Sequence, residues 1–160
     1  MNQYSKYGQL HFKKLKKFLG EYQNLPEEDM LHKIRLELKK LKVLFHFIEY
    51  CDKDFNATKE FSSLHRIFKK AGRIREIDVF ERLMINYNIE NINGIPSNME
   101  KAKMIQKFNK KIPQFIEEVR KKEKDLRKHL SKVEDEFYLK YLEEKNKDLK
   151  KGVNSSPGLL

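Results

Sequence analysis

Apolar residues recur at three- and four-residue spacing along almost the whole chain, and no stretch alternates apolar and polar residues long enough to indicate a strand. The pattern therefore predicts an all-α fold. A first helix is expected over about Tyr4 to Tyr22. A second should begin at Pro26, because proline is tolerated in a first helical turn and the acidic residues 27–29 offset the positive helix end. This second helix is expected to run to about Cys51.

Breaker residues divide the middle of the chain into shorter predicted elements. Thr58 is a suitable N-cap for a third helix, which is expected over 58–71 and to end at Gly72. A fourth helix is predicted to begin close to Arg73. The stretch 86–98 is rich in asparagine and glycine and contains a proline, so it is predicted to be a loop and hinge.

The C-terminal third is predicted to be helical again from Met99, with Pro113 kinking or restarting the helix. Beyond Pro113, apolar residues from Phe115 to Phe137 form one narrow seam, which predicts a long amphipathic helix that needs a partner helix from this chain or another copy. The composition of 152–160 predicts a disordered tail. The sequence thus predicts one helical domain over 1–151, an antiparallel bundle with a long C-terminal helix.

The net charge of the chain says more about possible binding partners than its length does. The 160 residues fit one domain, and 39% hydrophobic and 37% charged residues suit a helical bundle with solvated outer faces. The formal net charge of +11 will attract anions, so nucleic acid, an anionic membrane surface and a phosphate-rich ligand are all candidate partners. No apolar run approaches the roughly 20 residues needed to cross a bilayer, so we expect no membrane insertion. The single cysteine, Cys51, and the lack of an apolar signal segment favour a cytoplasmic location.

Basic side chains line one edge of the predicted second helix. At 100° per residue they fall within an arc of roughly 80°, and we call them the cationic stripe: His32, Arg35, Lys39, Lys42 and His46. Like charges three or four residues apart weaken a helix by about 0.2–0.5 kcal/mol per pair, and a bound anion would offset that cost. The alternative is an ordinary solvated lysine face.

A second basic cluster surrounds Gly72. Lys69 precedes it, and Arg73 and Arg75 would stand at the entry to the next helix, where free backbone N–H groups favour an anion. Asp78 would share a face with Arg75 and Arg82 and is predicted to hold a guanidinium in place by a bidentate contact. An ordinary surface ion pair is the alternative for Asp78.

The two clusters together resemble a known family. His32-x-x-Arg35-x-x-x-Lys39-Lys40-Leu41-Lys42, followed by Gly72-x-x-Arg75-Glu76-x-Asp78-Val79, is similar to the paired signature of CHAD domains, histidine-containing α-helical domains that bind inorganic polyphosphate. The resemblance covers about residues 26 to 84. It implies a basic groove between helices that holds a polyphosphate chain. The motif positions that carry over are His32, Arg35, Lys39, Lys40, Lys42, Arg75 and Asp78.

The chain departs from the family in its second half. Glu76 stands where the family usually has aspartate, and no second His-x-x-Arg helix follows. A homodimer whose twofold axis replaces the internal repeat is one hypothesis. A second tier of candidates, Arg120, Lys124 and Arg127, could form the opposite groove wall, against the alternative of a solvated helix face.

The sequence predicts a non-enzymatic binding protein with no cofactor. Its histidines lack metal-ligand spacing, and no P-loop or acidic pair pattern is present, so we expect no metal site and no catalytic residues. Two alternatives stay open: a nucleic-acid-binding helical protein, although no known nucleic-acid motif is present, and a helical adaptor that docks an acidic protein. Association with polyphosphate granules also stays open.

Overall fold

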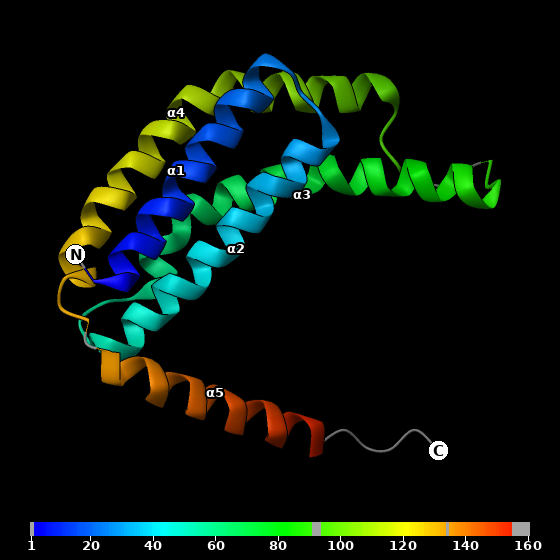
Figure 1. Cartoon of the computed structure of the whole chain (residues 1–160). Coiled ribbons are helices and arrows are strands. Elements are labelled where there is room, and N and C mark those ends of the chain that lie inside the picture. Colours follow the sequence, from blue (N-terminus) through cyan, green and yellow to red (C-terminus); the bar gives the residue numbers. More distant parts are fainter. Residues whose placement is uncertain (1, 91–93, 134, 155–160) are drawn as a thin grey trace.

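The computed structural model describes residues 2–90, 94–133 and 135–154 and confirms the all-α prediction (Figure 1). In that part of the chain there are five helices and no strands. They are α1 (Gln3–Asn24), α2 (Glu28–Cys51), α3 (Ala57–Tyr87), α4 (Asn98–Leu130) and α5 (Asp135–Asn154). The first two predicted helices agree with α1 and α2 to within a few residues at each end.

Helices α1 to α4 form a four-helix bundle. Each packs against two others: α1 contacts α2 and α4, and α3 also contacts α2 and α4, so α2 and α4 occupy opposite corners. The side-chain amide of Asn2 caps this arrangement at one end, since it donates to the carbonyl oxygen of Leu130 at 2.8 Å while its oxygen accepts from the backbone N–H of Ser5. Helix α5 extends from this end and contacts α2 (Figure 1).

The core contains the apolar face of every bundle helix. The apolar positions of α2 at helical spacing, such as Ile34, Leu38 and Leu41, are completely buried. Phe45 of α2 packs edge-on against Phe61 of α3, and Tyr22 of α1 packs edge-on against Phe108 of α4. In α2, the periodicity that predicted the helix therefore also identified its buried face.

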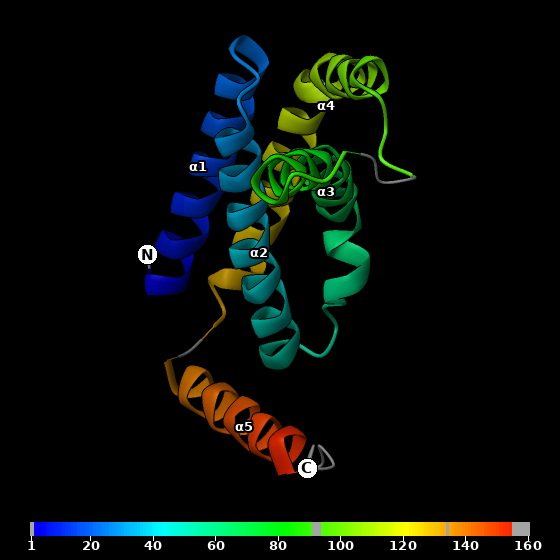
Figure 2. The same ribbon diagram turned by 90° about the vertical axis from the view of Figure 1, so that its right-hand side faces the viewer.

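Helix α3 is continuous, so the predicted helix end at Gly72 is wrong. Gly72 is buried in the middle of α3, and the helix runs on through Arg73 as far as Tyr87. The two halves of α3 point in different directions, as Figure 2 shows. The glycine thus serves close packing inside the helix rather than ending it.

Helix α4 also differs from its prediction. A capping box begins it, in which Ser97 and Glu100 bond each other's backbone N–H groups, and Pro113 lies within it without restarting the helix. Figure 1 shows α4 changing direction along its length, which agrees with the predicted kink. The long helix predicted to include Phe137 instead ends at Leu130.

The C-terminal part of the chain forms a separate helix. Residues 152–154, predicted to belong to a disordered tail, continue α5, and 155–160 lie outside the described residues. In the part of the chain that the structure describes, no helix is both long and apolar enough to span a membrane.

Candidate polyanion-binding surface

The two sequence clusters meet where Arg35 of α2 lies on Gly72 of α3. Arg35 Nη1 donates to the carbonyl oxygen of Phe68 at 3.2 Å, and the guanidinium carbon lies 4.1 Å from the centre of the Phe68 ring. A Cβ atom on residue 72 would lie only 1.7 Å from Arg35 Nη1. The missing side chain of Gly72 therefore creates the space that this guanidinium occupies.

Arg75 of α3 lies near enough for its charge to act on Arg35. Burial lowers the pKa of Arg35; the charge of Glu76 opposes that shift and the charge of Arg75 adds to it. The Nε of Arg75 is buried, and within the described residues it has no hydrogen-bond partner. A buried N–H group without a partner is uncommon in native proteins, and a bound anion or water would satisfy it. Arg75 thus lies within electrostatic range of Arg35.

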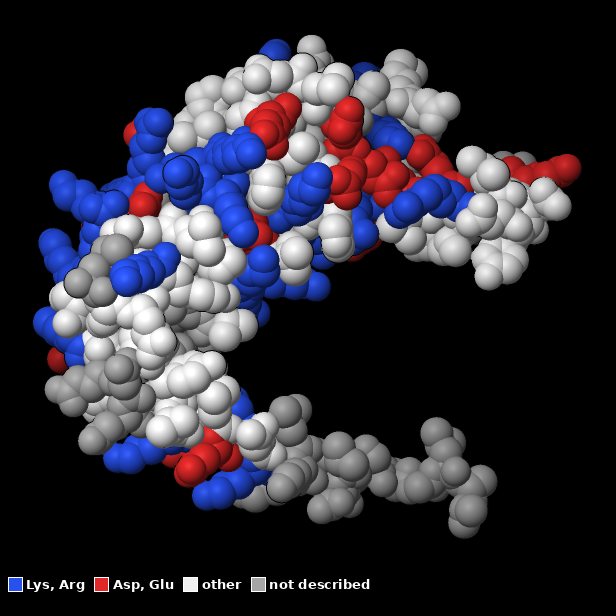
Figure 3. Space-filling model, viewed as in Figure 1, with Lys and Arg blue, Asp and Glu red and all other residues white. Residues whose placement is uncertain are grey.

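The remaining members of the cationic stripe point into solvent. His32, Lys39 and Lys42 are exposed, and the structure shows no ion pair for them with any described carboxylate. His46 lies half-exposed, 3.4 Å from Glu49. Figure 3 shows Lys and Arg side chains gathered over the middle of the face seen in Figure 1, with acidic side chains toward the end where α2 begins. The stripe is thus an exposed cationic edge of α2, and Arg35 is its member in contact with α3.

Lys40, also predicted to bind polyphosphate, takes part in a buried network that the sequence did not reveal. Its ammonium lies 2.9 Å from Glu37, whose other oxygen lies 2.5 Å from His11 Nδ1. Glu37 and His11 are almost completely buried, 3% and 5% exposed. Burial by itself would raise the pKa of Glu37, but hydrogen bonds from Lys40 and His11 outweigh it and leave the pKa below its usual value. Only the apolar positions around Glu37 hinted that this residue faces inward.

The prediction that Asp78 holds a guanidinium group is wrong. Asp78 is buried, and its carboxylate lies 2.6 Å from Lys101 of α4 instead of holding Arg75 or Arg82. Arg82 forms its ion pair with Glu28 of α2, at 2.5 Å. The reason is that both charges on this face are paired across helix contacts, Asp78 with α4 and Arg82 with α2. Asp78 is therefore part of the α3–α4 contact.

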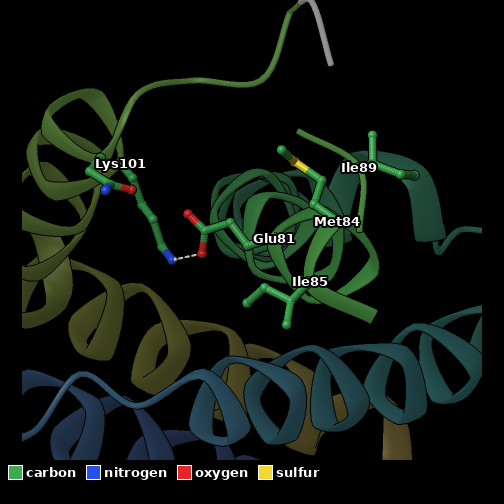
Figure 4. Close-up of a pocket in the computed structure, with 6 residues that line it drawn as sticks. Glu81, Met84, Ile85, Ile89 and Lys101 are labelled. Atoms are coloured by element: carbon green, nitrogen blue, oxygen red, sulfur yellow. Dashed lines mark hydrogen bonds and ion pairs between the residues drawn. The ribbon is translucent and has the colours of Figure 1, made fainter. Parts of the chain in front are cut away.

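Lys101 is the centre of that contact. Its ammonium also lies 2.6 Å from Glu81, as Figure 4 shows beside the apolar side chains of Met84, Ile85 and Ile89. These residues line a cavity of about 410 Å³ between the end of α3 and the start of α4. The two carboxylates raise the pKa of Lys101 against the opposing effect of burial. One lysine thus neutralises two acids at the point where the helices leave the bundle.

Replacing Lys101 with methionine should lower the free energy of unfolding by about 2 kcal/mol, because the buried carboxylate of Asp78 would remain next to Glu81 without a cation. Urea unfolding measures this. Lys103→Met changes an exposed lysine of the same helix turn and should alter the free energy of unfolding by less than about 0.5 kcal/mol. Equal effects of the two substitutions would contradict a structural role for Lys101.

Two predicted residues of the Gly72 cluster do not join Arg35. Arg73 lines cavities between α3 and α4, together with residues such as Met104. Lys69 is exposed, and no ion pair of it is seen among the described residues. The cluster is therefore divided between two sides of α3, since positions 73 and 75 are about 200° apart on a helix.

The second-tier residues do not form an opposite wall. Arg120 pairs with Glu117 and Arg127 with Glu123, in each case on α4 itself, while Lys124 is exposed. Because α4 occupies the corner of the bundle opposite α2, these side chains cannot line a groove with the cationic stripe. The alternative interpretation, a solvated helix face, describes them better.

Among the described residues, no group of three or more His, Cys, Asp or Glu side chains is arranged to hold a metal ion. Comparison of the chain with protein-family models, curated proteins and solved structures gave no match.

Proposed function

We propose that this protein binds inorganic polyphosphate, or a similar phosphate-rich polyanion, along the cationic stripe of α2 and the adjoining Arg75 of α3. The observation that carries the proposal is the pair of guanidinium groups from two helices. Arg35 is fixed against Phe68 and Gly72, and beside it the Nε of Arg75 is buried without a hydrogen-bond partner among the described residues. Fixed guanidinium groups recognise phosphate oxygens well, because their N–H donors form a planar fork.

The direction of the stripe favours a chain-like ligand over a single phosphate. Lys39 and Lys42 continue from Arg35 at intervals of one helical turn, which is about 5.4 Å. An extended polyanion can therefore contact several cations in succession, and each contact releases condensed counterions. The exposed position of Lys39 and Lys42 suits such a ligand.

Nucleic acid is the second candidate on charge alone. Aromatic residues near the stripe do not favour it: Phe45 and Phe47 are buried in the core, and Phe68 is covered by Arg35. Single-stranded nucleic acids generally gain affinity from bases stacked on exposed aromatic rings. Polyphosphate has no bases and needs none.

The double variant Lys39→Ala/Lys42→Ala tests the proposal. It should keep its fold, because both side chains are exposed, and should bind polyphosphate about tenfold more weakly. The slope of log affinity against log salt should become shallower by about 1.5, as expected for two lost phosphate contacts. Isothermal titration with polyphosphates of graded length at several salt concentrations measures both quantities.

The matched control is Lys145→Ala/Lys147→Ala, which removes the same charge from exposed positions of α5. It should bind polyphosphate almost as well as the unchanged protein. Equal losses from the two pairs would contradict a local site and indicate diffuse charge attraction. Displacement of polyphosphate by single-stranded RNA at equal phosphate concentration would favour the nucleic-acid alternative.

A further inference from the structure

A second basic site lies on the other side of α3, where that helix faces α4. Lys70, Arg73 and Ile74 of α3 line a cavity of about 310 Å³ together with Met104, Lys107 and Phe108 of α4. Three of these six residues are cations, and none is acidic. The cavity is separate from the cationic stripe, since no residue of α2 lines it.

The cations around this cavity are close together and lack acidic partners. Burial lowers the pKa of Lys70, and the nearby charges of Lys111, Arg66 and Arg73 lower it further. Of these residues, Arg66 has an ion pair, with Glu118 at 3.5 Å. For Lys70, Arg73, Lys107 and Lys111, the described part of the chain supplies no carboxylate within ion-pair distance.

Such an arrangement favours a bound anion. Neighbouring cations repel each other, and the repulsion grows as water is excluded. Long lysine side chains on exposed helix faces normally avoid this by turning apart. An anion between them would turn the repulsion into two attractive contacts.

The floor of the cavity adds a second property. Ile74 and Phe108 are core residues, and the partly buried Met104 packs against the core. An inorganic anion alone would leave this apolar surface in contact with solvent, whereas a ligand with an apolar part would cover it. A methionine side chain also adapts readily to flat aromatic groups.

We propose that this cavity is a binding site for a small organic phosphate, a phosphate monoester that carries a flat aromatic group, with Lys70, Arg73 and Lys107 on the phosphate and Met104 against the aromatic group. A mononucleotide is the simplest probe of this class. The site is independent of the polyphosphate proposal, because it uses different residues of α3 and none of α2.

The experiment is calorimetric titration of the full chain with AMP, adenosine and inorganic phosphate in separate runs. AMP should bind at least about tenfold more tightly than either of the other two, because only AMP contacts both the cations and the apolar floor. The variant Lys70→Met/Lys107→Met should weaken AMP binding by about tenfold or more. This variant should unfold at about the same urea concentration as the unchanged protein, because both side chains are exposed and neither forms an ion pair with a described carboxylate.

The control Lys103→Met/Lys110→Met removes the same charge from exposed positions of α4 outside the cavity and should leave AMP binding unchanged. Inorganic phosphate that binds as tightly as AMP would overturn the proposal, and so would equal losses from the two lysine pairs. Polyphosphate titration of Lys70→Met/Lys107→Met separates the two sites, since this variant should bind polyphosphate as tightly as the unchanged protein within about twofold.

Discussion

Replacing His11 with alanine is expected to destabilise the bundle by about 3 kcal/mol or more, the largest loss predicted for a single polar side chain of this protein. The substitution leaves the buried carboxylate of Glu37 with Lys40 as its remaining partner. It also removes the edge-on contact between the His11 ring and Tyr7, whose ring centres lie 4.2 Å apart. Unfolding in urea measures the lost free energy of unfolding. The slope of this free energy against urea concentration is compared between the variants.

His46→Ala is the matched control for His11→Ala. His46 also lies near a glutamate, Glu49, but both side chains are 40% exposed and 3.4 Å apart. Glu49 keeps its hydrogen bond from the backbone N–H of Ala57 at 2.9 Å. His46→Ala should therefore lower the free energy of unfolding by less than about 1 kcal/mol. An equal loss of stability in the two variants would show that the buried network contributes no more than an exposed ion pair.

The same network should determine the acid sensitivity of the fold. Because the pKa of Glu37 is lower in the folded chain than its usual value of 4.5, its ionised form contributes stability above that value. This contribution is lost as the pH falls below about 4.5 and through the lower folded pKa. Glu37→Gln should be less stable at neutral pH and show a flatter decline between about pH 5 and 3.

Replacing Gly72 with alanine should weaken polyphosphate binding but leave the free energy of unfolding almost unchanged. The new methyl group would occupy the position of the Arg35 guanidinium, which must move, since 1.7 Å is far inside any real contact. Alanine is favoured over glycine inside a helix by about 1 kcal/mol, which offsets the lost contacts of Arg35 with Phe68. We expect the free energy of unfolding to change by less than about 1 kcal/mol, while polyphosphate binding weakens about tenfold.

Gly20→Ala provides the control for Gly72→Ala. No atom would lie within 4 Å of the new methyl group at residue 20, so helix α1 should gain stability without any rearrangement. Polyphosphate titration should then give the affinity of the unchanged protein. If Gly72→Ala also bound with unchanged affinity, Arg35 would have no role in binding the polyanion.

Sequence periodicity predicted the elements better than their connections. Helical spacing identified α1 and α2 and the buried face of α2, because a helix that buries one face carries apolar residues every three or four positions. Gly72 was expected to end a helix, since glycine often does so. Its actual role is steric, and it depends on Arg35, 37 residues away in the sequence. No local pattern contains that information.

Ion-pair partners were the least predictable part of the candidate site. The face shared by Arg75, Asp78 and Arg82 suggested pairing within one helix, but Lys101 of α4 and Glu28 of α2 form the actual contacts. Spacing on one helix gives the direction of a side chain but not which neighbouring helix it meets. Glu37 was missed for the same reason, because its partner His11 belongs to another helix.

The order of helix contacts in the bundle has a consequence for how the chain folds. Contacts of α1 with α2, of α2 with α3 and of α3 with α4 all join neighbours in the sequence, whereas closure of α4 against α1 joins the two ends of the bundle. Loop closure over such a distance costs entropy that local pairs avoid. We therefore expect α1, α2 and α3 to assemble rapidly through contacts between sequence neighbours. Docking of α4 is then the slower folding step.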